Sequence, residues 1–124
     1  MTGITLDTGA LIALERRRQR MREIFERALV KEQPLTVPAD VVGEWWRGRT
    51  DVRDGILDSV DVEPLSVVLA KRAGEALAAI RGATLVDAIV MASAASRGDI
   101  VYSSDIDDLE RLRRYFPSVR VLQV

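Results

Sequence analysis

Short apolar stretches alternate with longer segments of helical spacing along this chain of 124 residues, and this alternation constrains the fold more than any other feature. Strands are predicted at residues 3–7, 35–37, 99–103 and 118–124, with a weaker strand at 61–65. The predicted order of elements is β-α-α-β-α-α-β-α-α-β-α-β. Because parallel strands need long, usually helical crossovers, this order predicts an α/β domain with a mostly parallel sheet covered by helices on both faces.

The predicted helices follow from apolar spacing and from end signals. Met21, Ile24, Phe25, Ala28 and Leu29 form an i, i+3, i+4, i+7, i+8 stripe, which is typical of an amphipathic helix. By similar signals, helices are expected from Thr8 to residue 17 and over 18–32, 38–48, 65–80, 84–97 and 106–116, whereas residues 49–60 are ambiguous. No repeat or linker interrupts this pattern, so we expect a single domain.

Two residue types that are common in enzyme sites are absent, because the chain contains no cysteine and no histidine. Their absence excludes disulfides, thiol nucleophiles and thiolate metal sites, together with Ser-His-Asp catalysis and histidine metal ligands. Any catalysis must therefore use carboxylates, hydroxyls, lysine or arginine, and carboxylates acting with a metal ion fit this composition best.

Targeting signals are not found in the sequence. The start, MTGITLD, lacks the basic and apolar regions of a signal peptide. No apolar run approaches the roughly 18 residues that span a bilayer. We therefore expect a cytoplasmic protein that does not enter a membrane. The net charge of −1 says little about nucleic acid binding, because local patches decide it.

The string D-T-G-A at residues 7–10 also opens the active site of aspartic proteases. Those proteases are all-β proteins, whereas residues 11–21, LIALERRRQRM, are not a strand sequence. The four-residue match is therefore a coincidence.

Acidic residues lie near the predicted carboxyl ends of the strands, where open α/β sheets have their functional crevice. Asp7 ends the first strand, Glu44 lies in the helix after the second, Asp87 opens the helix before the fourth, and Asp105 follows the fourth. If these carboxylates converge, they repel one another unless a cation lies among them. Mg²⁺ and Mn²⁺ suit such a set of oxygen ligands.

Each of these acids also has an ordinary structural explanation. Asp7 and Asp105 are suitable helix caps, Thr84-x-x-Asp87 reads as a capping box, and Glu44 is compatible with a solvated surface. Against this, Asp87 shares its helix face with apolar residues, and an unpaired carboxylate on such a face is costly. Taken singly, each acid leaves both interpretations open.

Four motifs in sequence carry a family resemblance: LDTGALIAL, the helix containing DVVGEW, LVDAIVMASA and VYSSDIDDL. Together they resemble the PIN domain, specifically the VapC-type toxins of bacterial toxin–antitoxin pairs, over essentially the whole chain. The resemblance implies a single domain over residues 1–124 with three α/β/α layers and a mostly parallel five-stranded sheet in the order 3-2-1-4-5. It also implies a metal-dependent endoribonuclease.

The same resemblance assigns roles to individual residues. It implies a catalytic and metal-binding quartet of Asp7, Glu44, Asp87 and Asp105, a further metal-supporting acid at Asp108, and supporting hydroxyls at Thr8 and Ser103. Ser103 stands where the family commonly has threonine. Whether Asp105 or Asp108 contacts the metal first, and whether one or two ions bind, stay open.

An acidic quartet with Mg²⁺ or Mn²⁺ predicts hydrolysis of RNA phosphodiester bonds by metal-activated water, leaving a 5′-phosphate and a 3′-hydroxyl. The RNA target and the cleavage sequence stay open, because they depend on surface shape and loops.

Arginines provide the candidate contacts to RNA, because cations displace counterions from phosphates. The prediction covers Arg16, Arg17 and Arg18 in the basic run at residues 16–22, and Arg47 and Arg49 after the acid at position 44. The alternative for the basic run is a solvated helix face whose charge is balanced by Glu15, Glu23 and Glu26.

Partners are implied by the resemblance alone: a homodimer, and a cognate antitoxin lying in a hydrophobic groove. Two other α/β classes fit poorly. Receiver domains need an acid beside the first-strand aspartate, and dehalogenase-type phosphatases need Asp-x-Asp, whereas Thr8 and Gly9 stand at these positions. The remaining alternative is a catalytically inactive PIN-like module that binds RNA or protein.

Overall fold

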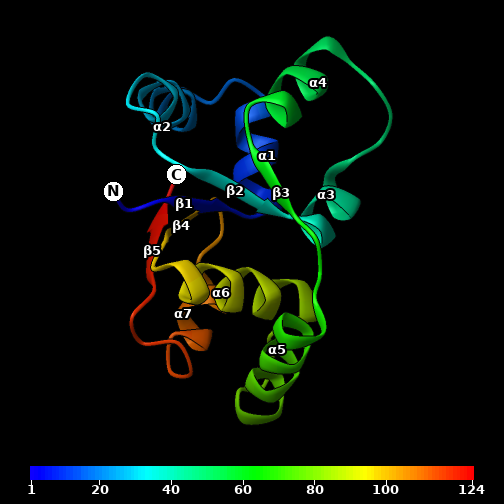
Figure 1. Ribbon diagram of the computed structural model, residues 1–124, viewed down its shortest axis with the longest axis vertical. Helices are drawn as coiled ribbons and strands as arrows, with labels where there is room; N and C mark the ends of the chain where they lie inside the picture. The colour runs from blue at the N-terminus through cyan, green and yellow to red at the C-terminus, as the bar shows by residue number, and fades with distance from the viewer.

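A computed structural model, which describes all residues 1–124, contains one five-stranded sheet in the order β3-β2-β1-β4-β5 (Figure 1). The strands are β1 (Ile4–Leu6), β2 (Leu35–Pro38), β3 (Asp61–Glu63), β4 (Ile100–Ser103) and β5 (Arg120–Gln123). Every neighbouring pair is parallel. The predicted α/β class and strand order are confirmed, and the sheet is wholly rather than mostly parallel.

Seven helices connect the strands and cover both faces of the sheet. They are α1 (Thr8–Glu15), α2 (Gln19–Val30), α3 (Ala39–Trp45), α4 (Asp51–Asp58), α5 (Val67–Ala79), α6 (Leu85–Arg97) and α7 (Asp107–Leu112). Helices α1, α2 and α4 lie on one side of the sheet, and α5, α6 and α7 lie on the other (Figure 1). None of the helices has the length and apolar character needed to cross a membrane.

All the predicted helices are shorter than expected, α3 and α7 by the most, and the ambiguous segment 49–60 contains α4. Helix α3 ends at Trp45 because Trp46 adopts an extended ψ of 129°. Helix α7 ends at Leu112, and the next residues form a turn before Pro117. Proline disfavours helical geometry in the residue before it, so Phe116 is not expected to continue the helix.

The core places α6 and β1 at the centre of the molecule. Residues 88–94 of α6 are all buried, as are Leu6 in β1 and Val101 in β4. A central strand buried on both faces is expected to be apolar, and ITL in β1 fits this except for Thr5.

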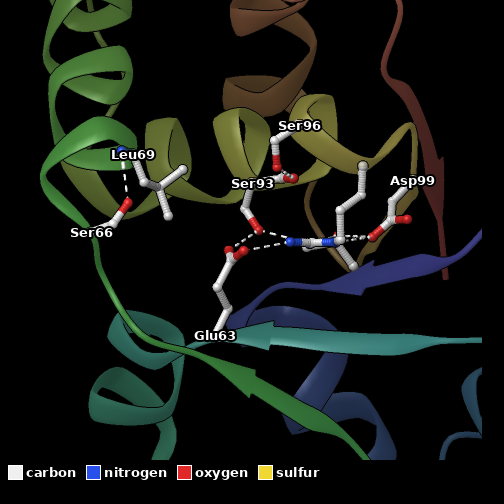
Figure 2. A network of polar contacts seen from close by, with 8 residues as sticks. Glu63, Ser66, Leu69, Ser93, Ser96 and Asp99 are labelled. Atoms are coloured by element: carbon white, nitrogen blue, oxygen red, sulfur yellow. Dashed lines mark hydrogen bonds and ion pairs between the residues drawn. The ribbon is translucent and has the colours of Figure 1, made fainter.

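A polar network that includes Glu63, Ser93 and Asp99 fastens α6 to the sheet (Figure 2). Thr5 belongs to the same network. The Arg97 guanidinium pairs with Glu63 of β3 at 2.7 Å and with Asp99 at 2.9 Å, and it also donates to the hydroxyls of Thr5 and Ser93. Asp99 is buried, and a buried charge needs such partners. The network therefore fixes one end of α6, the helix whose first turn carries Asp87.

Candidate active site

A pocket of about 150 Å³ opens beyond the carboxyl ends of β1 and β4, and we call it the acid pocket. All five predicted acids and both predicted hydroxyls line it: Asp7, Thr8, Glu44, Asp87, Ser103, Asp105 and Asp108. These residues come from segments up to about a hundred positions apart in the sequence. Parallel strands bring them together, because the carboxyl ends of all the strands lie at one edge of the sheet.

Asp7 is the most deeply buried acid of the pocket, with 8% of its surface exposed. It caps α1 by accepting a hydrogen bond from the Ala10 amide at 2.9 Å. The pKa of Asp7 is raised from 3.8 to about 6, and burial is the largest cause. The charges of Asp87 and Glu44 also raise the pKa, whereas hydrogen bonds from Ser103 and Ala10 lower it. The capping explanation is therefore correct for this residue, which also lines the acid pocket.

Asp87 faces the pocket from the first turn of α6. Thr84 caps this helix by accepting a hydrogen bond from the Asp87 amide at 3.1 Å, as the capping box predicts. Burial is the largest effect that raises the pKa of the Asp87 carboxyl, and the charges of Glu44 and Asp105 raise it as well. The negative charges of these carboxylates therefore repel one another within the pocket.

Glu44 and Thr8 contact each other across the pocket. The Thr8 hydroxyl donates to the Glu44 carboxylate at 2.6 Å, which ties α3 to the start of α1. Glu44 is exposed as a whole residue, yet its carboxylate turns toward Thr8. The hydroxyl therefore orients this acid.

Asp105 and Ser103 form a tight turn after β4. The Ser103 hydroxyl accepts from the Asp105 amide at 3.1 Å and lies 2.9 Å from the Asp105 carbonyl. The same hydroxyl lowers the pKa of the neighbouring Asp7 carboxyl. Ile106, and not Asp105 as predicted, occupies the N-cap position of α7, although the Asp105 carboxylate accepts a hydrogen bond from the Asp107 amide in the first turn at 3.3 Å.

Asp108 lies in the first turn of α7 at the rim of the pocket. It forms an ion pair with Arg111, one turn further along the same helix. Both side chains are more than 40% exposed, so this pair is a weak constraint on the position of the carboxylate.

The donor set of the pocket fits a hard divalent cation, because it consists of carboxylate and hydroxyl oxygens. No group of three or more acids is drawn together closely enough to form a ready ligand set. Glu44 contacts Thr8, Asp108 contacts Arg111, and the like charges repel one another. The carboxylates that could hold an ion in this pocket are those of Asp7, Glu44, Asp87, Asp105 and Asp108.

The predicted arginine contacts fall in different places. Arg16 and Arg18 line a cavity of about 350 Å³ beside the acid pocket, together with Gly9, Ile12, Ala13, Ser104 and Val124. We call this the arginine cavity. Arg17 instead lines an apolar groove of about 510 Å³ with residues of α1, α2 and α4. Arg47 and Arg49 line none of the three spaces, that is, the acid pocket, the arginine cavity or the apolar groove, and Arg49 pairs with Asp54.

Two lining residues, Gly9 and Ser104, were not predicted from the sequence. Both belong to the acid pocket and to the arginine cavity. A Cβ atom at Gly9 would overlap the Ser104 hydroxyl oxygen, so a larger residue at this position would require Ser104 to shift. The glycine within D-T-G-A was the available signal, but a sequence does not show what it approaches.

Comparisons with known proteins agree with this architecture. The DNA-bound VapBC complex of Salmonella typhimurium superposes with a TM-score of 0.78 at 18% identity, covering 99% of this chain and 98% of that one. The VapBC2 complex of Rickettsia felis, bound to a promoter DNA fragment, gives 0.77 at 12% identity, with 98% of each chain covered. VapC20 of Mycobacterium tuberculosis, described as a toxin that cleaves the sarcin-ricin loop, gives 0.63 at 22% identity, over 87% of this chain and 94% of that one.

At these identities the structural likeness shows a shared fold, which is the fold of VapC-type toxins. No curated protein sequence matches this chain significantly. The sequence model of the PIN domain, in contrast, matches residues 4–115. The chain therefore belongs to the PIN domain family.

Proposed function

We propose that this protein is a metal-dependent endoribonuclease, the toxin of a type II toxin–antitoxin module, that hydrolyses RNA phosphodiester bonds at the acid pocket. One observation carries the proposal: five acids from distant parts of the chain line one small pocket, and the buried Asp7 among them has a pKa raised to about 6. Strongly perturbed carboxyl groups that share a pocket are typical of functional sites.

The roles of the residues follow from their positions. Asp7 and Asp87 would hold Mg²⁺ or Mn²⁺ from the inner part of the pocket, while Glu44, Asp105 and Asp108 would complete the ligands directly or through water. Thr8 orients Glu44, and Ser103 supports the turn that carries Asp105. A bound divalent ion supplies acidity to water and neutralises charge on the phosphate.

The reaction is hydrolysis of a phosphodiester bond by water. The water oxygen bonds to phosphorus, the bond from phosphorus to the 3′ oxygen breaks, and that oxygen takes up a proton. The products are a 5′-phosphate and a 3′-hydroxyl, and the ribose 2′-hydroxyl takes no part.

Cleavage of total cellular RNA tests this function. Wild type, Asp7→Asn and the exposed control Asp58→Asn are each incubated with Mg²⁺, Mn²⁺ or EDTA, and new 5′ ends are sequenced. Discrete metal-dependent cuts by wild type and Asp58→Asn, absent with Asp7→Asn, are expected. Equal cutting by all three proteins would refute the assignment of the reaction to the acid pocket.

A second candidate function is a PIN-like module that binds RNA or protein without cleaving it. The observation that favours it is the lack of a ready group of three acids. Calorimetry with Mn²⁺ separates the two functions. A nuclease site binds Mn²⁺ in wild type and loses it in Asp7→Asn, whereas an inactive module has no need of the ion.

The apolar groove is where we propose that the antitoxin binds. Five apolar side chains line it, Leu14, Phe25, Leu29, Val52 and Ile56. Charged residues of both signs, Arg17, Arg22, Glu26 and Asp51, complete its lining together with Gly55. Leu29 and Val52 remain 44% and 37% exposed, so a partner would bury them.

The neighbouring residues Leu29 and Val30 offer a matched test of this binding. Leu29→Glu is expected to weaken co-purification of the co-expressed antitoxin and to leave RNA cleavage unchanged. Val30→Glu is the control, because Val30 is 84% exposed but does not line the groove. Equal effects of the two variants would contradict the placement.

We also propose a homodimer. The start of α5 supports it, because Val67 and Val68 are 71% and 69% exposed and lie near the exposed Leu65. Light scattering of wild type and Val68→Glu measures the mass, and a monomeric wild type would refute the proposal.

A further inference from the structure

We propose that the arginine cavity is a binding site for the nucleotide next to the scissile phosphate, with Arg16 and Arg18 holding the phosphate of that nucleotide. This inference rests on the proposed RNA cleavage. Of the three arginines at residues 16–18, Arg16 and Arg18 bind substrate and Arg17 does not.

The arginine cavity adjoins the acid pocket directly. Gly9 and Ser104 line both, and a Cβ at Gly9 would also approach the Ser104 backbone nitrogen to 3.2 Å. Only the close packing of α1 on this turn separates the two spaces. A chain whose phosphate lies in the acid pocket therefore has its neighbouring nucleotide at the arginine cavity. The volume of about 350 Å³ falls within the roughly 300–1,000 Å³ of small-ligand sites.

The turn after α1 sends the three arginines in different directions. Arg17 has a left-handed φ of 58°, which is unusual for a residue other than glycine. The amides of Arg17 and Arg18 donate to the carbonyls of Leu14 and Ala13, at 3.1 and 2.9 Å, which is the pattern of a Schellman motif. As a result, Arg16 and Arg18 line the arginine cavity while Arg17 lines the apolar groove.

Arg16 and Arg18 have no ion-pair partner, because the nearby acids are engaged elsewhere. Glu15 accepts from the Trp45 indole at 2.8 Å and pairs with Arg53 at 2.9 Å. Glu23 accepts from Gln19, and Glu26 pairs with Arg22. Arg16 and Arg18 are exposed but lie outside both helices, so the helical part of the predicted alternative is wrong for these two residues.

Arg16 and Arg18, which have no ion-pair partner, provide positive charge close to the acid pocket. Five carboxylates repel an RNA chain, so affinity must come from cations close to the acid pocket. Each guanidinium presents a planar set of donors that suits phosphate oxygens. Ile12, Ala13 and Val124 supply an apolar wall against which a base or ribose can pack.

Hydrogen bonds between distant segments hold the rim of the arginine cavity. The Arg20 side chain donates to the Gln123 carbonyl at 3.1 Å, and the Gln123 side chain donates to the Ser104 carbonyl at 3.3 Å. The Val124 amide donates to the Ser103 carbonyl at 2.9 Å. The start of α2, the end of β5 and the turn after β4 are thereby joined, so the cavity is a built feature of the fold.

The test measures RNA binding without catalysis. In an Asp7→Asn background with EDTA, the anisotropy of a labelled single-stranded RNA is followed from low to high NaCl. Arg16→Gln combined with Arg18→Gln is expected to reduce the salt dependence, log K against log[NaCl], by about 0.7 for each phosphate that the variant no longer binds. Affinity is expected to fall roughly tenfold or more at moderate salt, as for removal of charged hydrogen bonds of about 1.5 kcal/mol.

Two controls make the result specific. Arg27→Gln combined with Arg72→Gln removes the same charge from exposed sites on α2 and α5 and is expected to leave the binding slope nearly unchanged. Arg17→Gln, within the same turn, is also expected to bind RNA like its parent. An unchanged slope in the Arg16 and Arg18 variant, or equal losses in the controls, would overturn the inference.

Cleavage kinetics separate this inference from the proposed function. With active protein, the Arg16 and Arg18 substitutions are expected to raise KM for a longer oligonucleotide but not for a dinucleotide, while kcat changes little. If wild type does not cleave RNA but the binding slope still falls, the function fails and the binding site stands. If the substitutions abolish antitoxin binding and spare RNA binding, the arginine cavity belongs to the protein partner and the inference is wrong.

Discussion

Replacing the buried Asp7 by asparagine should stabilise the metal-free protein at neutral pH. Burial raises the pKa of Asp7 from 3.8 to about 6, so between these values the folded protein keeps a proton that the unfolded chain has lost. The free energy of unfolding therefore decreases as the pH rises from about 3.8 to about 6. This interval of about 2.2 units, at about 1.36 kcal/mol for each, corresponds to about 3 kcal/mol.

Asparagine does not ionise, so the variant does not lose this free energy of unfolding as the pH rises, and it keeps the local structure. Its side-chain oxygen can still accept from the Ala10 amide, and asparagine is as good an N-cap as aspartate. Asp7→Asn is thus expected to raise the free energy of unfolding by about 3 kcal/mol at pH 7.5, and by less than about 1 kcal/mol at pH 4, which is close to the unfolded pKa of 3.8, so that only a small part of the loss has occurred there.

Urea unfolding in EDTA at the two pH values measures this difference. The exposed Asp58→Asn serves as the control and is expected to change stability by less than about 0.5 kcal/mol. Added Mg²⁺ should narrow the gap by stabilising wild type alone, since a ligand stabilises the state that binds it. A variant no more stable than wild type at pH 7.5, or an equal gain at both pH values, would refute the account of Asp7.

Three further predictions concern binding and stability. Mn²⁺ affinity measured by calorimetry should fall steeply below about pH 6, because protons compete with the ion for Asp7; equal affinity at pH 5 and pH 7.5 would contradict this. Arg97→Met leaves the carboxylates of Glu63 and Asp99 without their cation and should lower the free energy of unfolding in urea by about 3 kcal/mol. Arg22→Met, which breaks the exposed pair with Glu26, is the control and should lower it by less than about 1 kcal/mol. Gly98→Ala should cost about 1 kcal/mol or more because Gly98 has φ of 73°, while Gly74→Ala inside α5 should stabilise by about 0.5–1 kcal/mol; thermal unfolding of both variants checks the contrast, and a stabilising Gly98→Ala or a destabilising Gly74→Ala would contradict it.

Much of the fold was predictable because its signals are local. Apolar strands and amphipathic helices alternate, and Thr84 and Gly98 mark the ends of α6 as expected. Parallel strands then place the acids that follow them at one edge, so the shared pocket of Asp7 and Asp105 follows from the order of elements. The strand order itself came from the family resemblance, since periodicity does not define which strands are neighbours.

The rest of the site depends on tertiary contacts that have no local signal. Ile106 rather than Asp105 occupies the cap of α7, and the Ser103 hydroxyl accepts from the Asp105 amide in the preceding turn. The sequence did not indicate this arrangement. Nor did it show that a left-handed residue at position 17 would separate three consecutive arginines. The engagement of Glu15 by Trp45 and Arg53 joins residues about thirty or more positions apart, and only the folded chain shows that this acid is unavailable to Arg16.

The central claim is that water, activated at the acid pocket, hydrolyses RNA, and the masses of the fragments test it most directly. A defined oligonucleotide containing a mapped cut site is incubated with the protein and Mg²⁺, and both fragments are measured by mass spectrometry. The account predicts one fragment with a 5′-phosphate, one with a 3′-hydroxyl, and no cleavage in EDTA. A fragment ending in a 2′,3′-cyclic phosphate would contradict it, because that product requires attack by the ribose 2′-hydroxyl.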